Sequence, residues 1–157
     1  MLTNYLIALI LIISNLTYNK PNEINLDFSN ETIVFEVQSE AQLPIKLDDF
    51  DYLVRCVEAE AGNQDYYGKA YVCDVILNRM DYFSYKSYSD VINDKGQFEC
   101  VSNGSINMVE PSEETYQVVM NELISRTNYD IMYFRTDRYH SFGTPILKHG
   151  DHYFSSR

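Results

Sequence analysis

The stretch from residue 50 to residue 79 constrains the fold of this chain most, because it has the pattern of two amphipathic helices joined by a Gly-Asn turn. Apolar residues in its first half recur at i, i+3, i+4, i+7 and i+11, the spacing of one apolar stripe on a helix. They are Phe50, Leu53, Val54, Val57 and Ala61. Asp48 or Asp49 can cap this helix, and Gly62 can end it in the left-handed conformation that glycine adopts without strain.

A second helix is expected from about residue 66 to residue 80. Its buried face should contain Tyr71, Val72, Val75, Ile76 and the aliphatic stem of Arg79. Gly68 lies in its first turns, where a glycine costs about 1 kcal/mol relative to alanine. We therefore expect another part of the backbone to approach closely at Gly68.

One carboxylate, Glu60, lies at the margin of the apolar stripe of the first helix. At about 100° per residue, the seven positions from Leu53 to Glu60 bring the two side chains within roughly 20° of each other around the helix axis. The Glu60 carboxyl should therefore point between the core and the solvent. Taken alone, a glutamate at such an edge is usually a solvated boundary residue, although glutamate is rarely buried without a cause.

The C-terminal half of the chain predicts further helices and a small sheet. Ser89 can cap a short helix that ends at a turn over residues 94–96. Residues 97–101 alternate like a strand before a hairpin turn at Asn103-Gly104, and strands are expected at 131–135 and 152–154 with a loop between them. A core-facing helix after Pro111 is predicted from the spacing of Tyr116, Val119, Met120, Leu123 and Ile124. The predicted fold class is α+β, a helical domain with a small antiparallel sheet.

The chain of 157 residues is expected to hold one domain behind an N-terminal appendage. The apolar run at residues 5–13 is too short for a standard membrane span and suits the hydrophobic region of a secretory signal. Residues 1–16 are therefore interpreted as a signal peptide or an N-terminal membrane anchor, with a buried strand as the alternative. The polar residues 17–46 are interpreted as a spacer with one strand at 32–37, or equally as a disordered leader.

Charge and the cysteine and histidine positions limit the kinds of ligand. The net charge of −11 argues against binding to nucleic acid or to an anionic surface. Cys56, Cys73 and Cys100 follow no zinc-ligand spacing, and their odd number favours small buried thiols over a bridge between Cys56 and Cys73. His149 and His152 have the spacing of a zinc pair, but i and i+3 on a strand face opposite ways unless a turn intervenes. We expect neither a metal nor another cofactor.

Several short motifs follow one another between residues 47 and 154. They are Glu60-Ala61-Gly62-Asn63-Gln64, Gly68-Lys69-Ala70, Val75-Ile76-Leu77-Asn78-Arg79, Gly96-Gln97-Phe98, Asn103-Gly104-Ser105-Ile106, Met132-Tyr133-Phe134 and His152-Tyr153-Phe154. In this order and spacing they resemble the SleB-type cell wall hydrolases, which cut the glycan strands of peptidoglycan. The chain departs from the family pattern twice. It has Gln64 where many relatives carry an acidic residue, which argues against a second carboxylate role at this turn, and Phe83-Ser84 where Phe-Pro is usual.

The resemblance implies a lysozyme-like fold over residues 47–157 and lytic transglycosylase action with one essential glutamate. Glu60 would be the general acid and base that cleaves the β-1,4 bond between N-acetylmuramic acid and N-acetylglucosamine. The residues expected to contact the sugar strand are Gln97, Phe98, Tyr133 and Tyr153. We expect the protein to be exported and to act at the cell wall or at the outer face of the membrane, with membrane contact through residues 5–13.

Three alternatives stay open at this point. A two-carboxylate glycoside hydrolase needs Glu58, Asp65 or Glu99 beside Glu60. Glu58 points about 160° away from Glu60 around the helix, and on a strand Glu99 would face away from Phe98. The second alternative is a noncatalytic wall-binding module, against which the retention of Glu60 argues, and the third is a metal-dependent amidase.

Overall fold

The computed structural model describes residues 25–27, 32–37 and 41–157, and it divides the chain into two compact units at the boundary between Phe50 and Asp51. The apolar run at residues 5–13, on which the export prediction rests, lies outside the described residues. Within the described ranges, no helix combines the length and hydrophobicity that a membrane span requires.

The first unit contains an antiparallel three-stranded sheet. Its strands are β1 (Asn25–Asp27), β2 (Thr32–Val37) and β3 (Ala41–Lys46), in the order β1-β2-β3. The strand predicted at 32–37 is confirmed, whereas β1 and β3 were not expected within the predicted spacer. Pro44 pairs with Val34 in β3. Because β3 is an edge strand, the missing N–H of Pro44 is tolerated there, which is why the proline did not break the strand.

The two predicted helices are α2 (Leu47–Ala61) and α3 (Tyr66–Phe83). All five residues of the predicted stripe on α2 are buried, from Phe50 to Ala61. On α3, Val72, Val75, Ile76 and Arg79 are buried as predicted, and Tyr71 is half-buried. The period of the apolar residues therefore located the buried face of α2 correctly, whereas α3 is buried well beyond its predicted face, since Cys73, Asp74 and Leu77 are buried as well.

The turn between α2 and α3 differs from the prediction. The glycines with positive φ in the described residues do not include Gly62, so its predicted left-handed conformation is wrong. Its N–H donates to Glu58 O at 2.8 Å, which continues the helical pattern. Glycine is required for a different reason, because a Cβ at Gly62 would lie 2.5 Å from the backbone oxygen of Glu58. Gly68 does allow a close approach, but by the side chain of Gln64 rather than by another backbone segment.

The short elements after α3 are helical. The helix α4 (Tyr88–Asn93) is capped by Ser87, which accepts from Asp90 N, and not by Ser89 as predicted. It ends at the predicted turn, where Gly96 has φ +75°. The strand predicted at 97–101 is wrong, since this segment contains the helix α5 (Glu99–Ser102). Gly104 begins the 3-10 helix η2 (Ser105–Asn107) instead of a hairpin.

The helix predicted after Pro111 is α6 (Glu113–Ile124), and Val119 and Met120 are buried as predicted, but the rest of its buried face differs from the predicted one. Thr115, Val118 and Glu122 are buried, whereas Ile124, predicted to be in the core, is 40% exposed. Two of these buried side chains are polar and are hydrogen-bonded: Thr115 to Glu58, and Glu122 to Thr127. Apolar spacing alone does not identify a helix face that contains satisfied polar groups.

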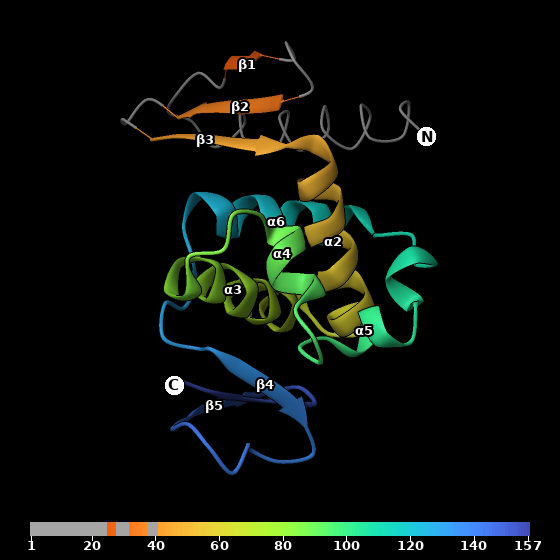
Figure 1. The fold of residues 1–157 in the computed structure, drawn as a ribbon, viewed down its shortest axis with the longest axis vertical. Helices are drawn as coiled ribbons and strands as arrows, with labels where there is room; N and C mark the ends of the chain where they lie inside the picture. Colours follow the sequence, from red (N-terminus) through yellow and green to blue (C-terminus); the bar gives the residue numbers. More distant parts are fainter. Residues whose placement is uncertain (1–24, 28–31, 38–40) are drawn as a thin grey trace. The chain divides into compact units, whose positions relative to one another are not determined.

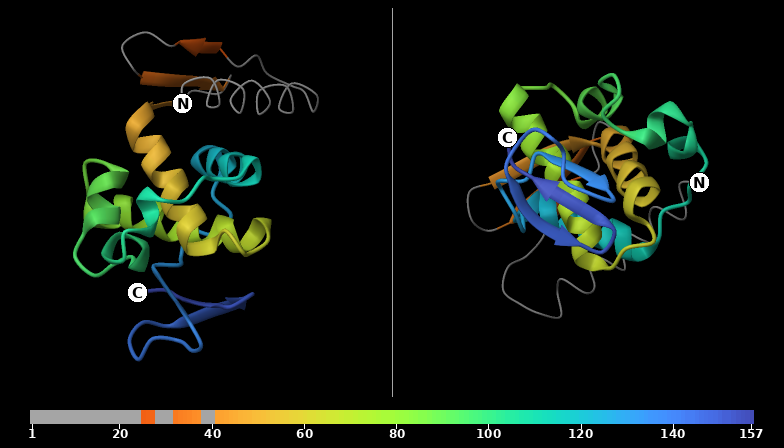
Figure 2. Two further views of the ribbon diagram at one scale, coloured as in Figure 1. Left: turned by 90° about the vertical axis from the view of Figure 1, so that its right-hand side faces the viewer. Right: turned by 90° about the horizontal axis from the view of Figure 1, so that it is seen from below.

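A second antiparallel sheet completes the second unit. It consists of β4 (Tyr133–Thr136), β5 (Pro145–His149) and β6 (His152–Ser155) in the order β4-β6-β5. Figures 1 and 2 show it as a layer at one end of the helices of this unit. The sheet packs on the helices through a cluster of Ala61, Val72, Val75, Ile131 and Phe154. The strand β5 was predicted as a loop, because Pro145 usually breaks a strand. It is accommodated here because β5 is an edge strand with a register shift between Pro145 and Leu147.

Two polar residues of α3 fix the start of β4. Asn78 donates to Asn128 O at 3.0 Å and to Ile131 O at 2.8 Å, and Arg79 Nε donates to Met132 O at 2.7 Å. These bonds satisfy backbone carbonyls that would otherwise be buried without a partner. The Asn78-Arg79 motif therefore attaches the sheet to the helices.

Candidate active site

A cavity of about 680 Å³ lies where the end of α2, the segment 96–105 and the second sheet meet. Three of the residues predicted for the site line it, namely Glu60, Gln97 and Phe98. Other lining residues are Glu99, Cys100, Asn103, Ser105, Arg135, His140 and His152. Its volume is in the range of ligand sites in proteins.

Glu60 occupies the final turn of α2, and it is half-buried as its position on the helix predicted. Its Oε1 accepts a hydrogen bond from Cys100 N at 2.8 Å. Cys100 is in the first turn of α5, where backbone N–H groups have no partner within the helix. The carboxylate therefore satisfies an otherwise unpaired donor, and this bond fixes its orientation. Among the described residues, Oε2 has no hydrogen-bond partner, so this oxygen is available to a ligand in the cavity.

Phe98 forms a buried aromatic wall of the cavity. Its ring centroid lies 6.2 Å from that of Phe134, and the Arg79 guanidinium lies 5.3 Å from the Phe98 ring. The same guanidinium lies 5.5 Å from the ring of Tyr133. The Arg79 guanidinium thus contacts the Phe98 ring and stabilises its position, in addition to donating a hydrogen bond to Met132 O.

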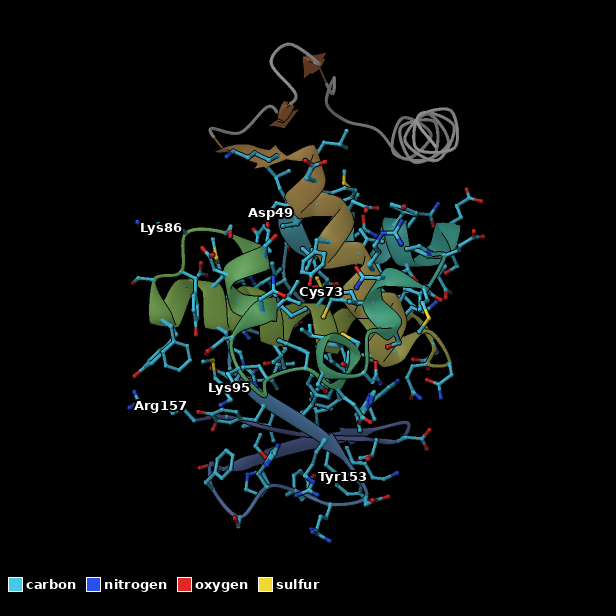
Figure 3. All side chains as sticks on the ribbon, turned by 45° about the vertical axis from the view of Figure 1, so that its right-hand side comes forward. Asp49, Cys73, Lys86, Lys95, Tyr153 and Arg157 are labelled. Carbon is cyan, nitrogen blue, oxygen red and sulfur yellow. The ribbon has the colours of Figure 1, made fainter. Side chains whose placement is uncertain are left out.

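Tyr133 and Tyr153, which were predicted to contact sugar, do not line this cavity. Tyr133 lies beside it, in an aromatic group with His140 and Phe142, at ring distances of 6.1 and 5.1 Å. Tyr153 lies on the face of the sheet away from the helices (Figure 3), where its ring packs against Tyr139 at 5.1 Å. The alternation of β6 explains this position, since the neighbours of Tyr153 on both sides are buried.

His152 is a cavity residue that the sequence indicated only as a zinc-ligand candidate. It is 4% exposed, and its Nδ1 has no hydrogen-bond partner within the described part of the chain. Burial lowers its pKa, an effect that the nearby charge of Glu60 partly opposes. The imidazole is therefore neutral at pH 7, with one ring nitrogen carrying a proton that can be donated. Its position beside Glu60 depends on strand pairing, which the motif His152-Tyr153-Phe154 alone does not reveal.

A turn does separate the two histidines that were considered as a zinc pair. His149 and His152 are cross-strand neighbours on β5 and β6. His149 Nε2 lies 2.6 Å from Asp65 Oδ1, outside the cavity that His152 lines. Among the described residues, no group of three or more metal-ligating side chains is present.

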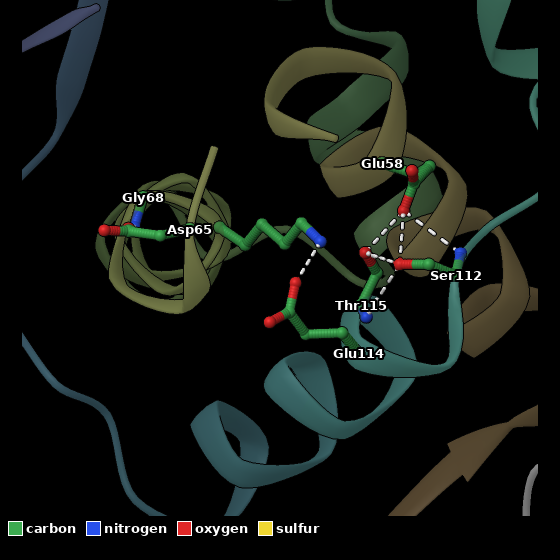
Figure 4. A network of polar contacts seen from close by, with 7 residues as sticks. Glu58, Asp65, Gly68, Ser112, Glu114 and Thr115 are labelled. Carbon is green, nitrogen blue, oxygen red and sulfur yellow. Dashed lines mark hydrogen bonds and ion pairs between the residues drawn. The ribbon is translucent and has the colours of Figure 1, made fainter. Parts of the chain in front are cut away.

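The alternative carboxylates occupy different environments. Glu58 accepts hydrogen bonds from Thr115 Oγ1 and, at 3.2 Å, from Ser112 N and Oγ (Figure 4). Asp65 caps α3 by accepting from Gly68 N at 3.0 Å, and this bond, together with His149, lowers its pKa. Neither residue lines the cavity. Glu99 does line it, together with Phe98, in the helical segment that replaces the predicted strand.

Gln64, one of the two departures from the family pattern, joins the turn after α2 to the turn between β5 and β6. Its Nε2 donates to Asp151 Oδ2 and its Oε1 accepts from Asp151 N, both at 3.3 Å. An amide can do both, whereas an ionised carboxylate only accepts. Glutamine at this position is therefore suited to the acidic partner that this chain provides.

Comparison with known proteins adds a family and a fold. The family model described as Cell Wall Hydrolase matches residues 63–155, a range that begins just after Glu60. The catalytic domain of the germination-specific lytic transglycosylase SleB from Bacillus anthracis matches with a TM-score of 0.61 and 23% identity, over 76% of this chain and 100% of that domain. The catalytic domain of the Bacillus cereus SleB protein matches with a TM-score of 0.63 and 22% identity, over 76% and 98% of the two chains. No curated protein sequence matches. The likeness to the two structures confirms the predicted α+β, lysozyme-like fold with a small antiparallel sheet.

Proposed function

We propose that this chain, which belongs to the cell wall hydrolase family, is a peptidoglycan-degrading lytic transglycosylase with Glu60 as general acid and base. The bond cleaved would be the β-1,4 glycosidic bond between N-acetylmuramic acid and N-acetylglucosamine. One observation carries the proposal: the Glu60 carboxylate faces a cavity of about 680 Å³ and is held there by the N–H of Cys100.

The proposed reaction needs one protein carboxyl. Protonated Glu60 donates to the bridging oxygen as the glycosidic bond breaks, and an oxocarbenium-like centre develops at the muramic acid C1. The C6 hydroxyl of the same sugar attacks that centre and returns its proton to Glu60. The product carries a 1,6-anhydro ring, and the acid is regenerated without a water molecule entering the reaction.

The cavity walls supply the remaining functions in this proposal. The buried ring of Phe98 offers an apolar face to a sugar, and Gln97 and the neutral His152 offer hydrogen bonds to its hydroxyl and acetamido groups. Tyr133, next to His140 at the side of the cavity, would contact the strand beyond the reacting sugars. Tyr153 faces away and has no role in the proposal.

A two-carboxylate hydrolase is the second candidate, and the position of Glu99 on the same cavity favours it. In that reaction Glu99 would activate a water molecule or act as the nucleophile.

A wall substrate also requires the protein to reach the outer side of the membrane. We propose that residues 5–13 direct this export.

Digestion of purified peptidoglycan followed by mass spectrometry of the soluble muropeptides tests the proposal. The expected products carry 1,6-anhydro ends and are about 18 Da lighter than hydrolysis products, since no water is added. Glu60→Gln should release about 100-fold less of them, or even less, while Glu110→Gln, which changes an exposed glutamate outside the cavity, should behave as the parent. Reducing sugar ends that disappear in Glu99→Gln would favour the two-carboxylate hydrolase, and unchanged release by Glu60→Gln would refute both reactions.

A further inference from the structure

We propose that Cys56 and Cys100 form an oxidative modification site, in which an intramolecular disulfide joins α2 to α5 beside Glu60. Their sulfur atoms lie 3.8 Å apart. The oxidant would be a disulfide of low molecular weight, or a protein disulfide of the kind that transfers disulfides in oxidising compartments. The proposal is independent of the glycosidic reaction, because it concerns only the two thiols.

The positions of the two cysteines suit a bond. Cys56 is four residues before Glu60 on α2, so both side chains lie on one side of that helix. Cys100 approaches the same side from α5, since its N–H donates to Glu60 Oε1 at 2.8 Å. The two segments are therefore already held together at this point. Bond formation requires the sulfurs to close from 3.8 Å to about 2.05 Å, a change that side-chain rotation can supply.

Access differs between the two thiols and sets the order of the steps. Both thiols are buried, at 2% exposure for Cys100 and 0% for Cys56, but Cys100 is part of the cavity wall and Cys56 is not, so a small disulfide that enters the cavity meets Cys100 first. The Cys100 thiolate attacks one sulfur of RSSR and releases one RS⁻. The Cys56 thiolate then attacks Cys100 Sγ and releases the second RS⁻. The two protons lost by the cysteines are taken up by the two released thiolates, so two RSH form for each disulfide.

Burial controls the rate of the second step. It raises the pKa of Cys56 well above the ordinary thiol value, and the neighbouring Cys100 and Glu60 raise it further. Little Cys56 thiolate is present at neutral pH, so closure in the folded protein should accelerate as the pH is raised toward 9.

Cys73 provides an internal control. Cys73 is buried in α3. Among the described residues, the sulfur contact that the structure shows joins Cys56 to Cys100 and does not include Cys73. The structure contains no bridge between Cys56 and Cys73, which was considered from the sequence, since all three thiols are free. The proposed site thus leaves one thiol unmodified.

The test uses the full-length protein, reduced and folded, then incubated with oxidised glutathione at about pH 8.5 and quenched by alkylation in denaturant, because all three thiols are buried in the folded protein. Alkylation should label all three thiols before oxidation and only Cys73 after it. The intact mass of the protein, measured before alkylation, should fall by about 2 Da on oxidation. Peptide mapping without reduction should find Cys56 linked to Cys100. Three labelled thiols after prolonged incubation of the wild type, or any link to Cys73, would overturn the proposal.

Variants separate the two steps. Cys73→Ser should form the bond as the parent does. Cys56→Ser should stop at a mixed disulfide between Cys100 and glutathione, and Cys100→Ser should leave Cys56 unmodified. An unmodified Cys100 in Cys56→Ser would contradict the proposed order. The bond would close a loop between cysteines that are 44 positions apart in the sequence, which restricts the unfolded chain. The melting temperature of the oxidised wild type should therefore be higher, by on the order of 10 °C. An oxidised protein that melts no higher than the reduced one would show that the bond does not fit the site.

Discussion

A buried pair of carboxyls should make the stability of this protein fall as the pH rises. Asp74 on α3 and Glu122 on α6 are 0% and 2% exposed. Asp74 Oδ2 accepts from Asn128 N at 2.8 Å, and Glu122 accepts from Thr127 N at 2.6 Å and from Thr127 Oγ1 at 2.9 Å. Burial raises the pKa of Asp74 to about 8, with further contributions from the charge and hydrogen bond of Glu122, and Arg126 opposes the shift.

The sign of the effect follows from proton binding. Asp74 has the ordinary aspartate pKa of 3.8 in the unfolded chain and a pKa of about 8 in the folded protein, so between these values the native state holds a proton that the unfolded state releases. The free energy of unfolding therefore decreases across this window as the pH rises. One proton corresponds to about 1.4 kcal/mol per pH unit, and the loss between pH 5 and pH 7.5 should be about 3 kcal/mol.

Asp74→Asn isolates this effect. The amide keeps the shape, its oxygen can still accept from Asn128 N, and its NH₂ can donate to Glu122 without a titratable proton. The free energy of unfolding of both proteins can be measured by urea denaturation at several pH values. The value for the variant minus the value for the parent should increase by about 3 kcal/mol from pH 5 to pH 7.5. Taking the difference removes the titration of other groups, including His152. Asp130→Asn, at an exposed position, should give a constant difference. Parallel stability curves for the parent and Asp74→Asn would refute the proposed protonation of Asp74 in the folded protein.

Three further predictions concern the cavity, the turn and the buried face of α6. Glu60→Gln should reduce release of muropeptides by about 100-fold or more with unchanged circular dichroism, since a general acid contributes at least that factor. Gln64→Glu should lower the free energy of unfolding by up to about 1 kcal/mol at low ionic strength through repulsion of Asp151, and added salt should reduce the loss. Val118→Ala should cost about 1–3 kcal/mol in chemical denaturation, because Val118 is fully buried, whereas Ile124→Ala, at a 40% exposed site, should cost less than about 0.5 kcal/mol.

The parts of the fold predicted correctly are those that long-period patterns determine. The apolar stripe of α2 is continuous over several turns, so its period of 3.6 is unambiguous, whereas α3 is buried at every position from Val72 to Arg79 and was identified as a helix but not as one that is enclosed nearly all round. Glu60 could be placed at the edge of the core for the same reason. The failures occur where polar groups replace apolar ones in the core. Thr115 and Glu122 are buried because they find hydrogen-bond partners, Glu58 on the distant helix α2 for Thr115 and Thr127 in the loop after α6 for Glu122, and the apolar pattern indicates neither partner.

The candidate site shows a second limit, which concerns short segments. Burial of Phe98 and Cys100 on either side of exposed Glu99 has the period of a strand, and over so few residues a single turn of helix produces the same alternation. The choice between them is made by tertiary contacts, since the helical form directs Cys100 N to Glu60 Oε1 and so pairs a donor with a carboxylate. The same local choice puts Glu99 on the cavity and brings the sulfur of Cys100 next to Cys56. The question of a second catalytic carboxylate and the proposed disulfide thus both depend on the one short helix that alternation alone could not predict.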